Sequence, residues 1–377
     1  MKTYRLLLLC VGLACSATAH ATNWLATQIV SQEGWSAGQV YGLNNLGQVI
    51  GTIDPPPPPP FGIFETVPMG FVTGPNGKGM QAIDPNYSPY IEYCHGCHTT
   101  YTPRAINDAG QVVASTFSSF SMDSTLQLTN PGGWITLPTP PSSLGIGSVA
   151  LNNSGQVAGT FIHWAPASFV TDANGSNPHA PAMLDNSYDS YITGINDHGQ
   201  LLVAGVLAGT SEFKHFVSGP NATGVAFEVG SGTRGLNNTA QLFGNYVNSN
   251  GDQASFVTGA NGVGFTDIGS LGGPTFANAI NNNGLVVGYS DGKAYVYGYQ
   301  GGGIVDLNQL VKLRTGEFLS EAADINDRGQ IVAMSNLGHM YLLSPVPEPA
   351  TYLMLLCGLA YLIYKTRGQP TSSISFT

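Results

Sequence analysis

A ten-residue pattern recurs seven times along this 377-residue chain and constrains its fold more than any other feature. The copy at residues 279–288 reads Ala-Ile-Asn-Asn-Asn-Gly-Leu-Val-Val-Gly, and the other copies differ from it by a few substitutions. The first Asn of the copies falls at positions 44, 107, 152, 196, 237, 281 and 326, so the intervals are 63, 45, 44, 41, 44 and 45 residues. Periods of roughly 40–45 residues are typical of four-stranded propeller blades.

Each repeat can be divided into four short strands. The first two strands flank the Asn-x-x-Gly turn, because Asn and Gly tolerate the positive φ angles that tight turns require. The third strand combines an aromatic residue with β-branched ones, as in Phe256-Val257-Thr258, and a second turn such as Asn261-Gly262 leads to the fourth strand. Such short strands are unstable alone, so we expect them to stack radially and bury their apolar faces.

The two ends of the repeat array indicate how it closes. The seventh copy has no fourth strand before Pro345, whereas an unassigned strand, Leu25–Val30, precedes the first Asn turn. We therefore predict an all-β fold, a seven-bladed β-propeller of about 44-residue repeats whose N-terminal strand completes the last blade. An open β-solenoid is the alternative.

Composition agrees with strands and turns and argues against one class of partner. Charged residues make up only 9% of the chain and Gly reaches 49, whereas helical surfaces are usually rich in Lys, Glu and Arg. The net charge is −10, and the chain between the two termini carries 8 basic and 21 acidic residues. Because a nucleic-acid footprint needs a basic face, we expect no nucleic-acid partner.

Both termini have the layout of targeting segments. Residues 1–21 combine Lys2 and Arg5 with an apolar run and end in Ala19-His20-Ala21, which predicts a signal peptide cleaved by signal peptidase after Ala21. At the other end, Pro347-Glu348-Pro349 precedes an apolar run of 15 residues and the basic residues Lys365 and Arg367. That run is short for a membrane span of about 20 residues, and the basic residues would keep its end in the cytoplasm.

Two resemblances follow from these residues. The segment from Ala254-Ser255-Phe256 through Leu271-Gly272-Gly273 to the turn at Asn281 resembles the bacterial HAF extracellular repeat family, which implies architecture rather than activity. The C-terminal combination resembles the PEP-CTERM sorting signal, which implies recognition by an exosortase-type membrane enzyme after transient membrane insertion; a plain anchor helix is the alternative. We divide the chain into a signal peptide (1–21), a repeat domain (22–344) with insertions at 54–61 and 85–103, a sorting or membrane segment (345–368) and a tail (369–377).

The two insertions contain the unusual local chemistry. Six prolines, 55–60, predict a stiff polyproline spacer. Cys94-His95-Gly96-Cys97-His98 has the c-type haem attachment spacing, in which His98 would be the proximal ligand. A disulfide between Cys94 and Cys97, a metal site that includes both histidines, and free thiols are the other interpretations, and an oxidising compartment favours the disulfide. The tyrosines of this insertion could stack on sugar rings or pack around the cysteine pair: Tyr87, Tyr90, Tyr93 and Tyr101.

Two catalytic signatures are missing from the sequence. It contains no His-Glu-x-x-His motif and no Gly-x-x-x-x-Gly-Lys motif. The turn residues Asp108, Asp197 and Asp327 give one carboxylate per turn, which is too few for calcium, so we expect turn chemistry and no metal. Carboxylates at the fourth-strand position could pair across the channel for glycoside or lyase chemistry, or could make repeated structural contacts: Asp84, Glu228, Asp267 and Asp306.

These observations predict an exported protein without catalytic residues or cofactor. We expect it in the cell envelope, at the outer surface or outside the cell, as an interaction or structural module linked to exopolysaccharide or surface proteins. One alternative is a redox protein that carries haem c on Cys94, Cys97 and His98. A second alternative is a carbohydrate-active enzyme that acts on the propeller face.

Overall fold

The structure is a computed structural model. The residues that it describes are 24–29, 35–58, 60, 64–84, 86–92, 99–118, 123–130, 133–138, 145–162, 167–185, 189–346 and 355–362. The chain divides into two units. The propeller body is Ala26–Ser344, and the second unit comprises Met1–Leu25 with Pro345–Thr377.

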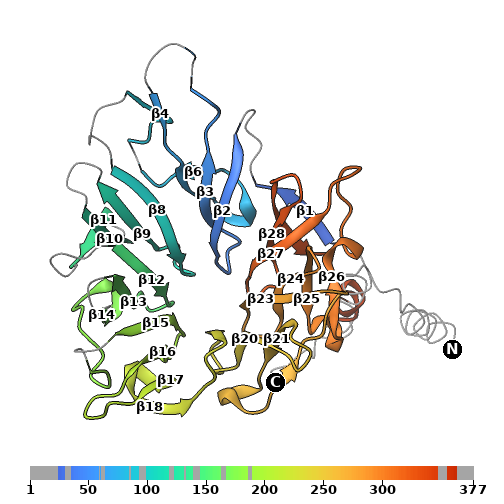
Figure 1. The fold of residues 1–377 in the computed structure, drawn as a ribbon. Helices are drawn as coiled ribbons and strands as arrows, with labels where there is room; N and C mark the ends of the chain where they lie inside the picture. The colour runs from blue at the N-terminus through green and yellow to red at the C-terminus, as the bar shows by residue number, and fades with distance from the viewer. Residues whose placement is uncertain are drawn as a thin grey trace, which may run out of the picture. The chain divides into compact units, whose positions relative to one another are not determined.

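Seven antiparallel sheets of the body are arranged around a common centre, which confirms the predicted seven-bladed β-propeller (Figure 1). Blade 1 has β2 (Ser36–Leu43), β3 (Val49–Asp54), β5 (Met69–Val72) and β6 (Gln81–Ala82), and blade 2 has β8 (Thr99–Ile106), β9 (Val112–Ser118), β10 (Asp123–Asn130) and β11 (Gly133–Leu137). Blade 3 has β12 (Gly145–Leu151), β13 (Val157–Ile162) and β14 (Ala167–Val170), and blade 4 has β15 (Ser190–Ile195), β16 (Leu201–Val206), β17 (Phe213–Gly219) and β18 (Thr223–Glu228).

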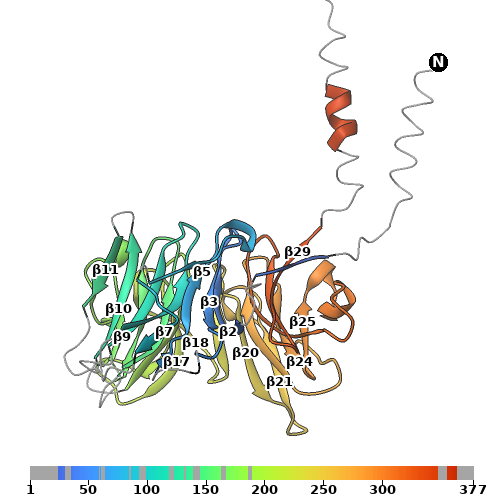
Figure 2. The same ribbon diagram turned by 90° about the horizontal axis from the view of Figure 1, so that it is seen from above.

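The remaining blades have the same order of strands. Blade 5 has β19 (Thr233–Leu236), β20 (Leu242–Val247), β21 (Gln253–Val257) and β22 (Thr266–Asp267). Blade 6 has β23 (Thr275–Ile280), β24 (Val286–Ser290), β25 (Lys293–Tyr297) and β26 (Ile304–Asp306). Blade 7 has β27 (Leu319–Ile325), β28 (Ile331–Ser335), β29 (Met340–Pro345) and β1 (Trp24–Gln28). Seen from the side, the strands of each blade run across the thickness of the body (Figure 2).

Blade 7 is built from both ends of the repeat array, as predicted. β1 lies beside β29, and the Ile29 N–H donates to the Met340 carbonyl at 2.9 Å. The Ile29 side chain is buried in a core cluster that also contains Leu342 of blade 7 and Phe71 of blade 1. The N-terminal strand therefore covers the edge that β29 would otherwise leave unpaired.

The glycine that ends several copies of the repeat has a packing role. At Gly288, an added Cβ would lie 1.9 Å from the Phe276 carbonyl oxygen of the neighbouring inner strand. At Gly51 the same atom would lie 2.4 Å from the Gln39 carbonyl oxygen and 2.9 Å from the Phe71 ring. Only glycine allows the aromatic residue of the third strand and the inner strand to approach this closely.

The inner strands carry a bulge at a constant place. In six blades the register with the second strand shifts three residues before the turn asparagine, at Tyr41, Arg104, Thr193, Arg234, Asn278 and Ala323. In blade 3 the shift lies between Ile146 and Val149. A bulge bends its strand and re-aims the side chains beside it, and here it recurs next to the centre of the ring.

Short 3-10 helices form the second turn of most blades. They are η1 (Pro75–Gly77), η2 (Ala173–Gly175), η3 (Pro220–Ala222), η4 (Ala260–Gly262) and η5 (Tyr299–Gly301), and η6 (Leu307–Gln309) follows β26. The central Asn of η1 has φ 55° and that of η4 has φ 54°, which is the left-handed conformation expected for these Asn-Gly turns. The Asn76 and Gly77 N–H groups donate to the carbonyls of Leu46 and Gly47, so this turn packs on the first turn of its blade.

The second insertion of the first repeat contacts the first insertion and the strand that follows it, which the sequence did not indicate. β4 (Phe64–Thr66), which follows the first insertion, pairs with β7 (Tyr90–Glu92) in an antiparallel two-stranded sheet. The Tyr90 hydroxyl donates to the Pro56 carbonyl at 3.2 Å, so the second insertion also contacts the polyproline segment. Within the described residues, blade 3 differs from the expected four strands, because only an isolated bridge between Val170 and His179 takes the place of its fourth strand.

The described part of the second unit is small. Residues 355–362 are helical and lie within the apolar run predicted near the C-terminus. In the portion of the chain that the structure describes, no helix has the length and hydrophobicity needed to cross a membrane. The signal peptide and the sorting residues Pro347, Glu348, Pro349, Lys365 and Arg367 lie outside the described residues.

Candidate functional site

The seven Asn turns converge on one end of the central channel, where each is held by its own asparagine. In blade 3 the Asn152 Oδ1 accepts from the N–H groups of Ser154 and Gln156 at 3.1 and 3.0 Å. Its Nδ2 donates to Gln156 Oε1 at 2.8 Å, and Gly155 has φ 75°. The Asn-x-x-Gly-Gln order thus satisfies the turn locally, as an Asx turn does.

The same asparagine also joins its blade to the next one. The Asn152 Nδ2 donates a second hydrogen bond to the Asn196 carbonyl at 3.0 Å. This bond recurs in every blade and closes on itself, because the Asn326 Nδ2 donates to the Asn44 carbonyl at 2.9 Å. The seven donors are Asn44, Asn107, Asn152, Asn196, Asn237, Asn281 and Asn326, all of them buried.

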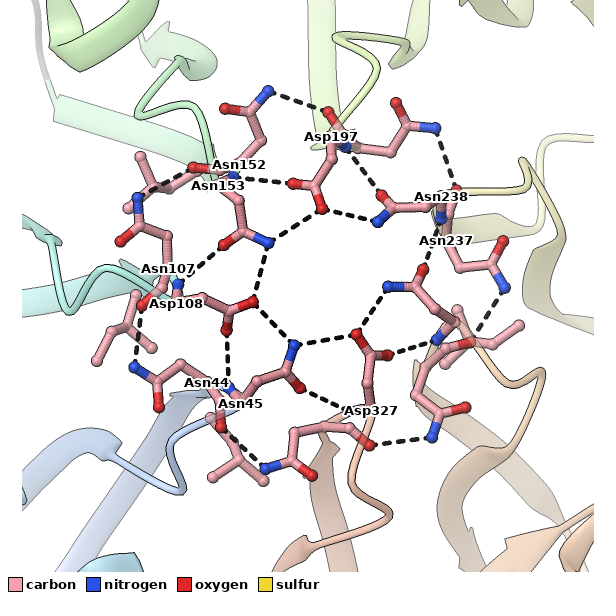
Figure 3. Close-up of a pocket in the computed structure, with 18 of the residues that line it drawn as sticks. Asn44, Asn45, Asn107, Asp108, Asn152, Asn153, Asp197, Asn237, Asn238 and Asp327 are labelled. Carbon is pink, nitrogen blue, oxygen red and sulfur yellow. Dashed lines mark hydrogen bonds between the residues drawn. The ribbon is translucent and has the colours of Figure 1, made fainter. Parts of the chain in front are cut away.

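A second ring is formed by the next residue of each turn, which is always Asn or Asp. Its backbone N–H donates to the Oδ1 of the following blade's residue, and the last bond, from Asp327 N to Asn45 Oδ1, is 2.8 Å long. Figure 3 shows these side chains pointing toward one another around the channel mouth. The members are Asn45, Asp108, Asn153, Asp197, Asn238, Asn282 and Asp327.

Asparagine amides and aspartate carboxylates alternate around most of this second ring. The Asp197 Oδ2 accepts from the Nδ2 atoms of Asn153 and Asn238 at 3.0 and 2.7 Å, and each of the other two carboxylates likewise accepts from two amides. Strict alternation cannot close with seven members. The like neighbours are the amides of Asn238 and Asn282, so no two carboxylates lie side by side, which would be repulsive.

The rings leave little acceptor capacity for a ligand. Each of the three carboxylates accepts one backbone N–H and two amide hydrogen bonds, out of about four lone-pair positions. The channel mouth encloses a cavity of about 230 Å³, bounded by both rings and by Leu or Ile residues that precede each turn asparagine.

The sequence predicted the turn chemistry but not the bonds between blades. The invariable Asn or Asp at the second turn position was the signal that could have indicated them.

One half-buried carboxylate at the closure of the ring was not predicted. Asp324 of β27 stands where the other blades have Gly or Ala, two residues before the turn asparagine. Its Oδ2 accepts from the Leu43 N–H of blade 1 at 2.8 Å, and its Oδ1 accepts from the Ile325 N–H at 2.8 Å. Burial raises the pKa of Asp324 to about 7, although both hydrogen bonds act in the opposite direction.

The predicted tyrosine group has separate packing partners. The Tyr87 hydroxyl donates to the Val67 carbonyl at 2.6 Å, and burial raises its pKa to about 12. Tyr101 packs against the Trp134 ring with centroids 5.9 Å apart. Tyr93, Cys94, His95, Cys97 and His98 lie outside the described residues, so the disulfide, haem and metal hypotheses remain predictions.

The predicted fourth-strand carboxylates each contact a partner in their own blade. Glu228 pairs with the Lys214 Nζ at 2.5 Å, and Asp267 accepts from the Tyr246 hydroxyl at 2.6 Å. Asp84 and Asp306 accept from the N–H groups two residues further along the chain. Among the described residues, no group of three or more His, Cys, Asp or Glu side chains is placed to hold a metal ion.

The comparisons with known proteins identify the architecture. No family model matches the chain, and no curated protein matches it. The propeller of the Trilobed protease from Pyrococcus furiosus, described as having an open velcro topology, is 8% identical with a TM-score of 0.52, over 84% of this chain and 97% of that one. The chain folds as a β-propeller. Whereas the Pyrococcus propeller is described as open, the first strand of the present chain pairs with its last strand, β1 with β29.

Two further solved structures are similar to this propeller. An oligogalacturonate lyase from Vibrio parahaemolyticus is 9% identical with a TM-score of 0.53, over 86% of this chain and 94% of that one. TolB from Acinetobacter baumannii is 13% identical with a TM-score of 0.41, over 74% of this chain, which spans 61% of the TolB chain. At such identities the likeness concerns the fold alone.

Proposed function

We propose that this chain is an exported, non-catalytic β-propeller that serves as an interaction or structural module of the cell envelope or extracellular matrix. Its partners would be exopolysaccharide or other surface proteins. The proposal combines the supported propeller fold with the targeting segments predicted at residues 1–21 and 345–368.

The absence of a catalytic role in this proposal is supported by the two rings of hydrogen-bonded turn side chains at the channel mouth. A general acid or base must exchange a proton with a substrate at hydrogen-bonding distance. Here the carboxylates of Asp108, Asp197 and Asp327 each hold three N–H groups of the protein itself. Their arrangement favours a role in joining the blades over a role in a reaction.

Export and sorting can be tested on the full chain. We would express it with a tag inside the repeat domain, in cells with and without an exosortase, and follow its mass and its cell fraction. We expect removal of residues 1–21 in both strains and a further C-terminal cleavage in the first. Replacing Pro347, Glu348 and Pro349 by Ala should abolish that second cleavage. An unprocessed chain that stays in the cytoplasm would contradict the proposal.

A second candidate, a haem-bearing redox protein, is favoured by one specific observation, the Cys-x-x-Cys-His sequence at 94–98 in a chain with a predicted signal peptide. An absorption spectrum of the exported protein separates it from the first. A Soret band that survives acid-acetone extraction would establish covalent haem. We expect no such band, and a mass lower than that of the reduced form by two hydrogen atoms if Cys94 and Cys97 form a disulfide.

The carbohydrate-active enzyme alternative is tested by incubating the exported protein with oligogalacturonate and with neutral glucans. Release of unsaturated or reducing ends above the level of a heat-denatured control would contradict the non-catalytic proposal. We expect none.

A further inference from the structure

A pocket of about 530 Å³ lies on blade 5 and shares no lining residue with the cavity at the Asn turns. It is lined by aromatic residues of blade 5 and by the segment 228–233, which leads from blade 4 into blade 5. The volume is within the range of about 300–1,000 Å³ that is usual for small-molecule sites. The function proposed above does not account for this pocket.

The aromatic wall is a layered cluster with one exposed ring. Phe265 stacks on Phe256 with centroids 5.0 Å apart and an interplanar angle of 21°, and Tyr246 meets Phe265 edge-on at 5.2 Å. Phe256 is buried, whereas Phe265 is 59% exposed. A ring that is fixed from below and open above offers a flat apolar platform to a ligand.

Most other blades lack this aromatic ring. Counting from the residue that faces the core aromatic, the strand position of Tyr246 holds Ile53 in blade 1, Gly205 in blade 4, Ser290 in blade 6 and Ser335 in blade 7. Blade 3 has Phe161 at this position, stacked on Phe169, but both of these rings are buried. Blade 5 differs from blade 3 by the hydroxyl of Tyr246 and by the exposed outer ring of Phe265.

Polar groups border the platform. The Tyr246 hydroxyl donates to Asp267 Oδ2 at 2.6 Å, and Glu228 lies at the rim with one oxygen paired to Lys214. The Thr233 hydroxyl, also in the lining, is buried and makes no hydrogen bond within the described structure. The pocket thus combines an aromatic face with the carboxylate acceptor of Glu228.

The segment 228–233 of the lining leaves open space at one glycine. At Gly230 an added Cβ would meet no atom within 4 Å, so the glycine leaves space that a side chain would fill. A second cavity of about 330 Å³ is bordered by Asn248, Asp252 and Asp267. The Tyr246 hydroxyl of the first lining donates to Asp267 of the second, so one hydrogen bond connects the two linings. Two cavities connected in this way suit a chain-like ligand better than a single small molecule.

We propose that these two pockets bind two neighbouring hexopyranose units of a neutral polysaccharide, with one sugar ring stacked on Phe265. A pyranose has an apolar C–H face that suits an aromatic platform, and hydroxyl groups on its rim that donate to carboxylates such as Glu228. The bordering acids Glu228, Asp252 and Asp267 and the net charge of −10 disfavour an anionic glycan. The inference rests on the proposed function, because it names the polysaccharide class and the site of the interaction module.

Affinity electrophoresis of the exported protein tests the site. The probes are dextran, galactomannan and a mixed-linkage β-glucan as neutral polymers, and polygalacturonate as the anionic one. We expect at least one neutral polymer to retard the protein and polygalacturonate to have no effect. Phe265→Ala should weaken retardation about tenfold, the scale of one aromatic contact of about 1.4 kcal/mol. Gly230→Leu should do the same by filling the pocket.

The matched control is Phe213→Ala, which removes another exposed phenylalanine, 51% exposed and outside the lining of both cavities. It should leave retardation unchanged. Because Gly230 has open space around it, Gly230→Leu should keep the thermal midpoint of the parent, which separates a blocked pocket from a misfolded one.

The outcomes are distinguishable from a failure of the proposed function. Retardation that persists in both Phe265→Ala and Gly230→Leu would refute the pocket as the binding site, while the protein would still be a polysaccharide-binding module. Retardation by polygalacturonate alone would overturn the neutral ligand. If no polymer retards a chain that is exported and sorted as expected, the glycan site is wrong but export and sorting stand.

Discussion

Replacing Asp197 by Asn tests whether the ring of turn side chains holds the propeller together. The substitution keeps the shape and one oxygen, which can still accept the Asn153 N–H. In the parent, Oδ2 accepts amide hydrogen bonds from Asn153 at 3.0 Å and from Asn238 at 2.7 Å. The substitution puts an NH₂ group in the place of this oxygen. Three amide donors would then face one another.

The expected cost follows from these two bonds. Hydrogen bonds to a charged group contribute about 1.5–3 kcal/mol each, and a half-buried site reduces that by solvent screening. We therefore expect Asp197→Asn to lower the free energy of unfolding by about 2–3 kcal/mol. The assay is urea unfolding of the exported protein at pH 7, followed by fluorescence, with the change read from the midpoint at constant slope.

The control removes the same charge at another place. Asp291 is exposed and lies 4.0 Å from the Lys293 Nζ, so Asp291→Asn should change the free energy of unfolding by less than about 0.5 kcal/mol. If Asp197→Asn unfolds at the same urea concentration as Asp291→Asn, the ring contributes nothing measurable and the argument for its role is refuted.

Three further predictions concern the same framework. Asn152→Asp should lower the free energy of unfolding by about 3 kcal/mol in the same assay, because a buried carboxylate would face the Gln156 Oε1 and the Asn196 carbonyl; an unchanged midpoint would contradict the ring. Asp324→Ala should remove a pH dependence of stability. The pKa of Asp324 is about 7 in the native protein and about 4 in the unfolded chain, so the free energy of unfolding of the parent falls by up to about 4 kcal/mol as the pH rises from about 4 to 7. Parallel plots of the free energy of unfolding against pH for parent and variant would refute this. Ile29→Ala should cost about 2–4 kcal/mol by thermal unfolding, and an unshifted midpoint would mean that the N-terminal strand does not lock blade 7.

The period of the repeat made the fold predictable. A turn that needs Asn and Gly fixes the first hairpin of each blade, and the missing fourth strand after Met340 pointed to the strand at Leu25–Val30. Both predictions follow from local chemistry and counting, and the structure confirms them. Strand limits were less predictable, because register bulges and packing decide where pairing stops, as in β22 (Thr266–Asp267).

The contacts between blades could not be read from the sequence in the same way. The bond from the Asn152 amide to the Asn196 carbonyl depends on the curvature of the closed ring, which no single repeat specifies. The pairing of β4 with β7 depends on the second insertion folding back onto the segment that follows the first one. The blade 5 pocket arises because residues far apart in the repeat pattern, Tyr246 and Phe265, meet on the surface of one sheet.

The use of both chain ends in blade 7 imposes an order of events during synthesis. Ile29 and its partner Met340 are 311 positions apart. At about 5–20 residues per second, a ribosome delivers Met340 roughly 15–60 s after Ile29. For that interval six blades can assemble while the first strand waits with its edge unpaired, open to pairing with other chains. Any machinery that handles the nascent protein must therefore shield a few N-terminal residues until almost the whole chain has emerged.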